Sequence, residues 1–227
     1  MQDHQFLKTL SSPKIKDTRV LGLWLFPKTL PLKPITLHET KWANELSAAR
    51  KKEYKYSRGY ARFALSALFD VDPLKIPLHA SPGQAPELAQ GWGYISLSHC
   101  SDAVLIGWSP KELGVDLERS NRRCNPKLLS NRFFFKNEQE FIKNSDEGIL
   151  SQNVLSRWVI KEAAIKWQKG SIYKDLIQWE SERNYKWAYH NSLKLKIETE
   201  LIRYQSWLIA IAYDKKNHNN RPVICLS

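Results

Sequence analysis

The sequence predicts an α+β fold. Strand-like and helix-like segments are mixed along the 227 residues, without the regular alternation that marks a parallel sheet with crossover helices. In addition, each half of the chain contains a pair of strand-like segments and one long helical segment. This arrangement permits two similar α+β subdomains, and the best boundary lies near Ser109 and Pro110. The expected domains are therefore residues 1–110 and 111–227.

The expected strands are short runs that are either apolar or alternating. Residues 193–201 alternate apolar and polar side chains over most of their length, as in a strand with one buried face. Residues 207–213 form a continuous apolar run. Residues 94–99 and 103–108 flank a polar turn, which predicts a hairpin. Two further strands are expected at residues 20–26 and 113–118.

The clearest helix is expected over residues 151–168, because this segment has no internal glycine or proline and is followed by Gly170. A longer helical pattern covers residues 39–69, with expected breaks near Ser57 and Gly59. Two shorter helices are expected after asparagine N-caps: residues 126–134 after Asn125, and residues 138–143 after Asn137.

The composition is that of a folded protein. Apolar residues make up 42% of the chain and aromatic residues 11%, which excludes a disordered or low-complexity protein. The longest apolar runs are far shorter than the roughly 20 residues of a membrane span, and the first residues lack the features of a signal peptide. Three cysteines without CxxC spacing indicate reduced thiols. We therefore expect a cytoplasmic protein.

The net charge of +12 indicates an anionic partner or ligand. Nucleic acid, anionic lipid, a phosphorylated cofactor and an acidic protein all satisfy this condition. Charge alone does not choose among them.

Asp116 and Glu118 are two positions apart in an expected strand, so their side chains point to the same face. Two carboxylates this close repel each other unless both are solvated or a cation joins them. Hard oxygen ligands of this kind suit Mg²⁺. For this segment taken alone, a solvated strand face beside Arg119 is the simpler alternative.

Trp158, Glu162 and Lys166 follow one stripe of the clearest helix at intervals of four residues, and Lys161 precedes Glu162. An ordinary Glu–Lys helix pair explains this spacing. The alternative is that Glu162 supplies a third oxygen to a metal ion while the lysines bind phosphate.

His99 closes an apolar strand at a turn, where a partly exposed imidazole can donate a hydrogen bond to an anion. A structural role is the alternative. Other residues with plain structural explanations belong to a turn-rich loop and to a basic helix surface: Gly83, Pro86, Arg50, Arg58 and Arg62.

Four segments, taken in chain order, resemble a known family. They are GQAPEL at residues 83–88, SLSH at residues 96–99, GVDLE at residues 114–118 and WVIKEAAIK at residues 158–166. Together they resemble the 4′-phosphopantetheinyl transferases of the surfactin-synthetase-activating type. The last two segments are the most specific, and the resemblance spans about residues 50–170, over half of the chain.

The resemblance implies an enzyme that moves the phosphopantetheine arm of coenzyme A onto a serine of an acyl, peptidyl or aryl carrier protein, with release of adenosine 3′,5′-bisphosphate. It implies Asp116, Glu118 and Glu162 as Mg²⁺ ligands, at the interface of two subdomains related by a pseudo-two-fold axis. Glu162, Lys166 and His99 are the implied catalytic residues. Whether Glu162 or a metal-bound water takes the serine proton stays open.

The resemblance also implies residues that bind coenzyme A. These are Arg50, Arg58, Arg62, Gly83, Pro86, Ser98, His99, Lys161 and Lys166. In relatives a lysine often follows the loop glycine, whereas Gln84 and Ala85 occupy that place here. This departure leaves the contacts to the adenine and the 3′-phosphate open.

An acidic carrier protein would account for the positive charge. Residues 119–143 contain seven basic residues against two glutamates, interleaved with the three phenylalanines of residues 133–135. A basic rim around apolar anchors suits a transient protein interface. The alternative places the phenylalanines in the core. The resemblance further implies a monomer.

Two alternatives remain at this stage. The first is a basic nucleic-acid-binding protein or a metal-dependent nuclease, because Asp17 followed by Glu39, Thr40 and Lys41 superficially fits a carboxylate plus Glu-x-Lys arrangement. Exposed aromatic side chains could then stack on bases. The second is a catalytically silent relative that binds a carrier protein, which the intact set of acidic residues disfavours.

Overall fold

The computed structural model describes residues 21–214 and the backbone of residues 223–226. These residues divide into two compact units: residues 21–112 with 223–226, and residues 113–214. The mixture of helices and sheets confirms the expected α+β class. No helix in the described part of the chain is both long and apolar enough to cross a bilayer.

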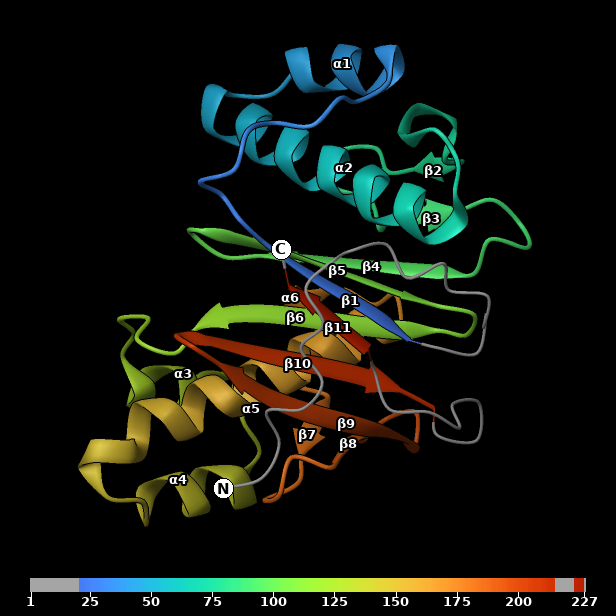
Figure 1. The fold of residues 1–227 in the computed structure, drawn as a ribbon. Helices are drawn as coiled ribbons and strands as arrows, with labels where there is room; N and C mark the ends of the chain where they lie inside the picture. The colour runs from blue at the N-terminus through green and yellow to red at the C-terminus, as the bar shows by residue number, and fades with distance from the viewer. Residues whose placement is uncertain (1–20, 215–222, 227) are drawn as a thin grey trace. The chain divides into compact units, whose positions relative to one another are not determined.

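The first unit is a four-stranded sheet covered by a long helix (Figure 1). The strand order is β11-β1-β5-β4, with β11 parallel to β1 and the other pairs antiparallel. Helix α2 buries Tyr60 and Leu65 against Phe26 and Ile106 of the sheet. The elements of this unit are β1 (Gly22–Pro27), α1 (Leu37–Asn44), α2 (Ala48–Phe69), the 3-10 helix η1 (Pro73–Lys75), β2 (Leu78–His79), β3 (Glu87–Leu88), β4 (Tyr94–His99), β5 (Ala103–Ser109) and β11 (Val223–Leu226).

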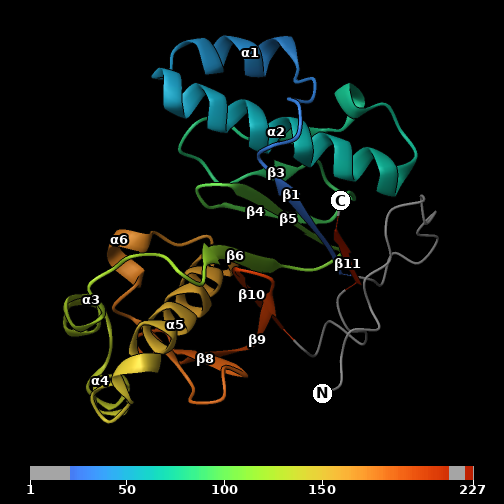
Figure 2. The same cartoon turned by 60° about the vertical axis from the view of Figure 1, so that its left-hand side comes forward.

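The second unit is a five-stranded antiparallel sheet with the order β6-β10-β9-β8-β7. Helix α5 packs on this sheet (Figure 2), where Val159, Ile160 and Ala163 share a core with Leu208 and Ala210. The elements of this unit are β6 (Leu113–Arg119), α3 (Pro126–Phe133), α4 (Lys136–Lys143), α5 (Glu147–Trp167), α6 (Ile172–Asp175), β7 (Trp179–Ser181), β8 (Trp187–His190), β9 (Leu195–Tyr204) and β10 (Trp207–Tyr213).

The chain end differs from the domain prediction. Residues 111–227 were expected to form one subdomain, but the last strand, β11, pairs with β1 and therefore belongs to the first unit. Parallel pairing of strands about 200 residues apart has no local sequence signal, because it depends on a long crossover rather than on a turn.

The helical segment of residues 39–69 is interrupted between α1 and α2, not near Ser57 and Gly59 as the sequence predicts. Gly59 lies inside α2 because the backbone of the preceding segment comes very close to it. A Cβ atom at Gly59 would lie 2.6 Å from the carbonyl oxygen of Lys33. The glycine therefore allows close packing and does not end the helix.

Of the two predicted asparagine N-caps, the structure confirms one and contradicts the other. The side chain of Asn125 accepts a hydrogen bond from the backbone N–H of Leu128 at 3.0 Å, which confirms it as the N-cap of α3. The predicted cap Asn137 is wrong, because α4 begins two residues earlier than expected, at Lys136, and its N-cap is Phe135. The N–H of Phe135 donates to the carboxylate of Glu138 at 2.9 Å instead.

Gly114 sets the distance between β6 and α5. A Cβ atom at this position would lie 1.9 Å from the carbonyl oxygen of Ala163 and 2.4 Å from the backbone nitrogen of Trp167. The strand and the helix thus touch backbone to backbone, and the acidic residues that follow Gly114 lie against the last turns of α5.

We expect Gly114→Ala to lower the free energy of unfolding by about 2 kcal/mol, because the added methyl group can be placed only by separating β6 from α5. Urea unfolding measures this change. Gly148→Ala is the matched control, since a Cβ atom there meets no neighbour within 4 Å and alanine favours a helix. Equal stabilities of the two variants would contradict the close packing.

Candidate functional site

The second unit brings three of the predicted residues together. Asp116 comes from β6, while Glu162 and Lys166 lie one turn apart on α5. The ammonium group of Lys166 donates to Oδ1 of Asp116 at 2.7 Å. The side chain of Asp116 is 5% exposed and that of Lys166 is 25% exposed. A buried carboxylate is therefore paired with an amine that reaches solvent.

Glu162 carries the most strongly perturbed carboxyl group of this cluster. Burial, the negative charge of Asp116 and a side-chain hydrogen bond to Asp116 together raise its pKa to about 8, against the opposing effect of Lys166. Glu118 adds a smaller repulsion. At neutral pH the carboxyl of Glu162 is therefore mostly protonated.

Glu118 is paired with a different cation, Arg122. One carboxylate oxygen accepts a hydrogen bond from the backbone N–H of Arg119 at 2.9 Å, and the other forms an ion pair with Arg122. The guanidinium of Arg122 lies 5.8 Å from the ring centre of Trp158, on the α5 stripe. Sequence reasoning placed Arg122 only in the basic surface, because a spacing of four residues predicts a side-chain pair only within a helix.

The donor set partly fits a divalent cation. Carboxylate oxygens suit Mg²⁺, and the crowding that raises the pKa of Glu162 is what a cation would relieve. However, no group of three or more His, Cys, Asp or Glu side chains among the described residues is arranged to hold a metal ion. Asp116 and Glu118 are both engaged with side-chain cations instead.

Lys161 lies elsewhere. Its side chain is fully buried, and its amine donates to the carbonyl oxygen of Phe133 at 2.7 Å and to the carboxylate of Glu138 at 3.1 Å. Burial lowers the pKa of Lys161, and the charge of Glu138 opposes this effect. This placement corrects the prediction that Lys161 binds the cofactor, because an enclosed amine that is already paired does not reach a phosphate.

Glu138 links three elements of the second unit. Besides Lys161 of α5, its carboxylate accepts hydrogen bonds from both the N–H and the hydroxyl of Ser181 in β7, each at 3.0 Å. Arg157 lies 4.0 Å away and donates to the carbonyl and hydroxyl of the same serine. The sequence offered no signal for this network, because its contacts join residues 19 to 43 positions apart.

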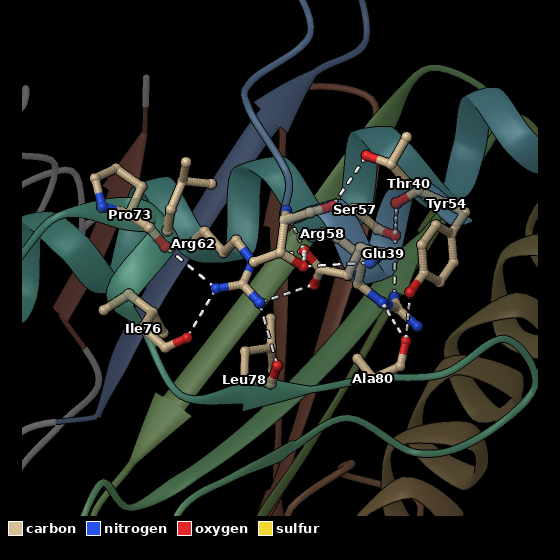
Figure 3. A network of polar contacts seen from close by, with 12 residues as sticks. Glu39, Thr40, Tyr54, Ser57, Arg58, Arg62, Pro73, Ile76, Leu78 and Ala80 are labelled. Carbon is tan, nitrogen blue, oxygen red and sulfur yellow. Dashed lines mark hydrogen bonds and ion pairs between the residues drawn. The ribbon is translucent and has the colours of Figure 1, made fainter. Parts of the chain in front are cut away.

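Arg58 and Arg62 are also buried, with 8% and 2% of their surface exposed (Figure 3). Arg62 forms a two-pronged ion pair with Glu39 at 2.8 and 3.0 Å and donates to backbone carbonyls of residues 73–78. Arg58 donates to the carbonyl of Ala80 at 3.0 Å, and burial lowers its pKa. Both arginines therefore stabilise the segment after α2, which corrects their prediction as cofactor ligands.

The same network bears on the nuclease alternative. Glu39 is 2% exposed and is held by Arg62, so its carboxylate is not available to a metal ion at the surface. Asp17, the other carboxylate of that arrangement, lies outside the described residues.

Among the predicted cations of the first unit, Arg50 and His99 remain exposed. His99 is 45% exposed, and its Nε2 lies 3.1 Å from the carboxylate of Glu53, three residues after Arg50 on α2. Ser98 is buried next to His99 on β4.

Gly83 lies in an exposed turn, and the half-buried Pro86 directly precedes β3. Gly83 has a φ of +81°, a left-handed conformation that favours glycine, and no atom lies within 4 Å of a Cβ built there. Its role in the turn is therefore conformational.

The basic segment of residues 119–143 keeps most of its charged side chains in solvent. Phe134 is 6% exposed and packs with Ile142 and Val154 in a small core, as the structural alternative expected. Leu128 on α3 is 62% exposed and is the apolar side chain that this surface presents.

Residues 112–217 match the family model of the 4′-phosphopantetheinyl transferase superfamily. The matched segment contains Asp116, Glu118, Glu162 and Lys166. The match covers somewhat less than half of the chain and agrees with the resemblance at the level of the superfamily. A comparison with curated proteins gives no match.

We expect Lys161→Met to lower the free energy of unfolding by about 3 to 5 kcal/mol, because it leaves the buried carboxylate of Glu138 without its amine. Thermal and urea unfolding measure the loss. Lys174→Met, at an exposed position of α6, is the control and should stay within about 0.5 kcal/mol of the parent protein. A free energy of unfolding that is unchanged in Lys161→Met would contradict a structural role for this ion pair.

In the absence of divalent cations, we expect the stability of the second unit to fall as the pH rises from about 5 to about 8. The unfolded chain releases the proton of Glu162 near its ordinary pKa of 4.5, whereas the folded chain holds it to about 8. Between these values the folded state binds more protons, so rising pH favours unfolding. Urea unfolding at several pH values tests this.

Glu162→Gln is the comparison for the pH series, because glutamine keeps the shape of the side chain and cannot titrate. Its stability should depend less on pH over the same range. If both proteins show the same pH dependence, Glu162 is not the responsible group.

Proposed function

We propose that this protein is a phosphopantetheinyl transferase of the surfactin-synthetase-activating type. It would transfer the 4′-phosphopantetheine arm of coenzyme A to a serine of an apo carrier protein and release adenosine 3′,5′-bisphosphate. The observation that carries the proposal is the contact of Asp116, Glu162 and Lys166, with Glu118 beside them, inside the segment that matches the superfamily.

Asp116, Glu118 and Glu162 would hold Mg²⁺. When bound, the ion would neutralise charge on the pyrophosphate of coenzyme A and make the bisphosphate a better leaving group. Glu162 can join this ligand set only as a carboxylate. Because its pKa is about 8, we expect the affinity for Mg²⁺ to rise with pH through this range.

The chain's own residues would handle the phosphate and the proton. Lys166 would place its ammonium group near the phosphorus under attack. The serine oxygen forms a bond to this phosphorus, the bond from phosphorus to the bridging oxygen of the bisphosphate breaks, and the serine proton passes to a base. Glu162 or a water molecule held by the metal is that base.

In the first unit, His99 and Arg50 are the exposed cations suited to the phosphates of coenzyme A. The exposed basic side chains of residues 119–143 suit an acidic acyl, peptidyl or aryl carrier protein. The monomeric state, the cytoplasmic location, and a site at the interface of two subdomains related by a pseudo-two-fold axis stay predictions.

Incubation of the pure protein with coenzyme A, Mg²⁺ and an unmodified carrier protein tests the proposal, with intact-mass spectrometry of the carrier as the readout. We expect the mass of the phosphopantetheine arm to be added, and EDTA to stop the reaction. Asp116→Ala and Glu162→Ala should each lower kcat/KM about a hundredfold or more, because each removes charge stabilisation of several kcal/mol.

Glu182→Ala is a matched control, because Glu182 is an exposed carboxylate outside β6 and α5. It should transfer the arm at the parent rate. Unchanged rates in both Asp116→Ala and Glu162→Ala would remove the proposed site. Salt-sensitive binding to DNA of any sequence, without transfer to a carrier, would favour the nucleic-acid alternative.

A further inference from the structure

Both acidic residues of β6 are paired with a side-chain cation. Lys166 of α5 lies 2.7 Å from Oδ1 of Asp116, and Arg122, which follows β6, pairs with Oε2 of Glu118. One oxygen atom of each of these two carboxylates is thus paired with a positive charge of the protein itself.

We propose that Lys166 and Arg122 are internal counter-ions, which hold the acidic cluster together in the metal-free protein and move away from Asp116 and Glu118 when a divalent cation binds. The inference rests on the proposed function for the identity of the cluster as a Mg²⁺ site. It adds a role for Lys166 that precedes any contact with phosphate, and it brings Arg122 into the site.

The ion pair with Lys166 stabilises the buried carboxylate of Asp116 when no metal ion is bound. Asp116 is 5% exposed, so an unpaired carboxylate at this position would be desolvated without a compensating charge. An ammonium group at 2.7 Å supplies that charge. The cation therefore stabilises the buried carboxylate of Asp116.

The same pairing competes with a metal ion. Mg²⁺ binds oxygen at about 2.0 to 2.1 Å and demands near-octahedral geometry, so an ammonium group on the same carboxylate would lie within a few ångströms of a doubly charged ion. At such distances the repulsion between like charges is large. Lys166 would therefore have to withdraw for the ion to bind Oδ1 of Asp116.

Both cations are able to move. Lys166 is 25% exposed on a flexible stem, and Arg122 is 39% exposed. Arg122 also lies against the ring of Trp158, which gives its guanidinium a second partner after it leaves Glu118. By contrast, Lys161 is enclosed and bonded to Glu138 and to a backbone carbonyl, so it cannot act in this way.

Displacement of Lys166 by the metal ion would make phosphate binding by Lys166 depend on metal binding. While Lys166 neutralises Asp116, its charge is not available to a phosphate group. Once Lys166 is displaced, its amine is a free cation beside the metal ligands, at the place where the pyrophosphate of coenzyme A would lie. Lys166 would therefore become competent only in the metal-loaded protein.

Mn²⁺ binding, followed by electron paramagnetic resonance at pH 8.5 without coenzyme A or carrier protein, tests the inference independently of transfer. We expect Lys166→Met and Arg122→Gln each to bind Mn²⁺ about fivefold more tightly than the parent protein, as the loss of a competing ion pair of about 1 kcal/mol requires. Competition with Mg²⁺ should show the same order of affinities.

Lys186→Met is the matched control for the change in net charge. Lys186 is exposed in the turn between β7 and β8, at the sheet edge opposite to β6. Its affinity for Mn²⁺ should stay within about twofold of the parent protein, because charges separated by more than a Debye length are largely screened. Circular dichroism establishes that each variant is folded.

Affinities that are unchanged or weaker in both Lys166→Met and Arg122→Gln would overturn the inference, as would the absence of Mn²⁺ binding in all the proteins. If Lys166→Met does not fold without metal, Arg122→Gln decides the outcome. Failure of the proposed function is distinguishable, since it would appear as a parent protein that transfers no arm to a carrier while the order of Mn²⁺ affinities still holds.

Discussion

The backbone contact between β6 and α5 is the constraint on which the candidate site depends. Gly114 leaves no room for a side chain against Ala163 and Trp167, so the strand and the helix approach as closely as two backbones can. This packing brings together residues 50 positions apart, Asp116 and Lys166. It also crowds carboxyl groups into a space with little water, which is the cause of the raised pKa of Glu162.

Three ion pairs of this protein share one chemistry and differ in burial. In the pairs Glu39–Arg62 and Glu138–Lys161, both side chains are at most 3% exposed, and the cations also bind backbone carbonyls. Such pairs fasten segments of the chain to one another. The pair Asp116–Lys166 differs because its cation reaches solvent. Exposure of the cation thus distinguishes the pair Asp116–Lys166 from the two pairs that fasten the fold.

Local sequence patterns predicted much of the fold. The hairpin of β4 and β5, the strand β6 and the N-cap Asn125 follow from alternation and turn residues, and the structure confirms them. The strands β7, β8 and β11 were not predicted, because they are short or pair with distant partners. The interruption between α1 and α2 was misplaced, since Gly59 is used for close packing and not as a helix breaker.

By itself, the sequence determined that Asp116 and Glu118 share one strand face and that Glu162 and Lys166 share one helix stripe, because these periodicities are local properties of strands and helices. Only the tertiary structure decided which cations are available for binding. Arg58, Arg62 and Lys161 look like surface charges in the sequence, yet they are buried, and Arg62 and Lys161 are held by Glu39 and Glu138. Burial and pairing with a distant carboxylate depend on how the elements pack, and no local spacing encodes them.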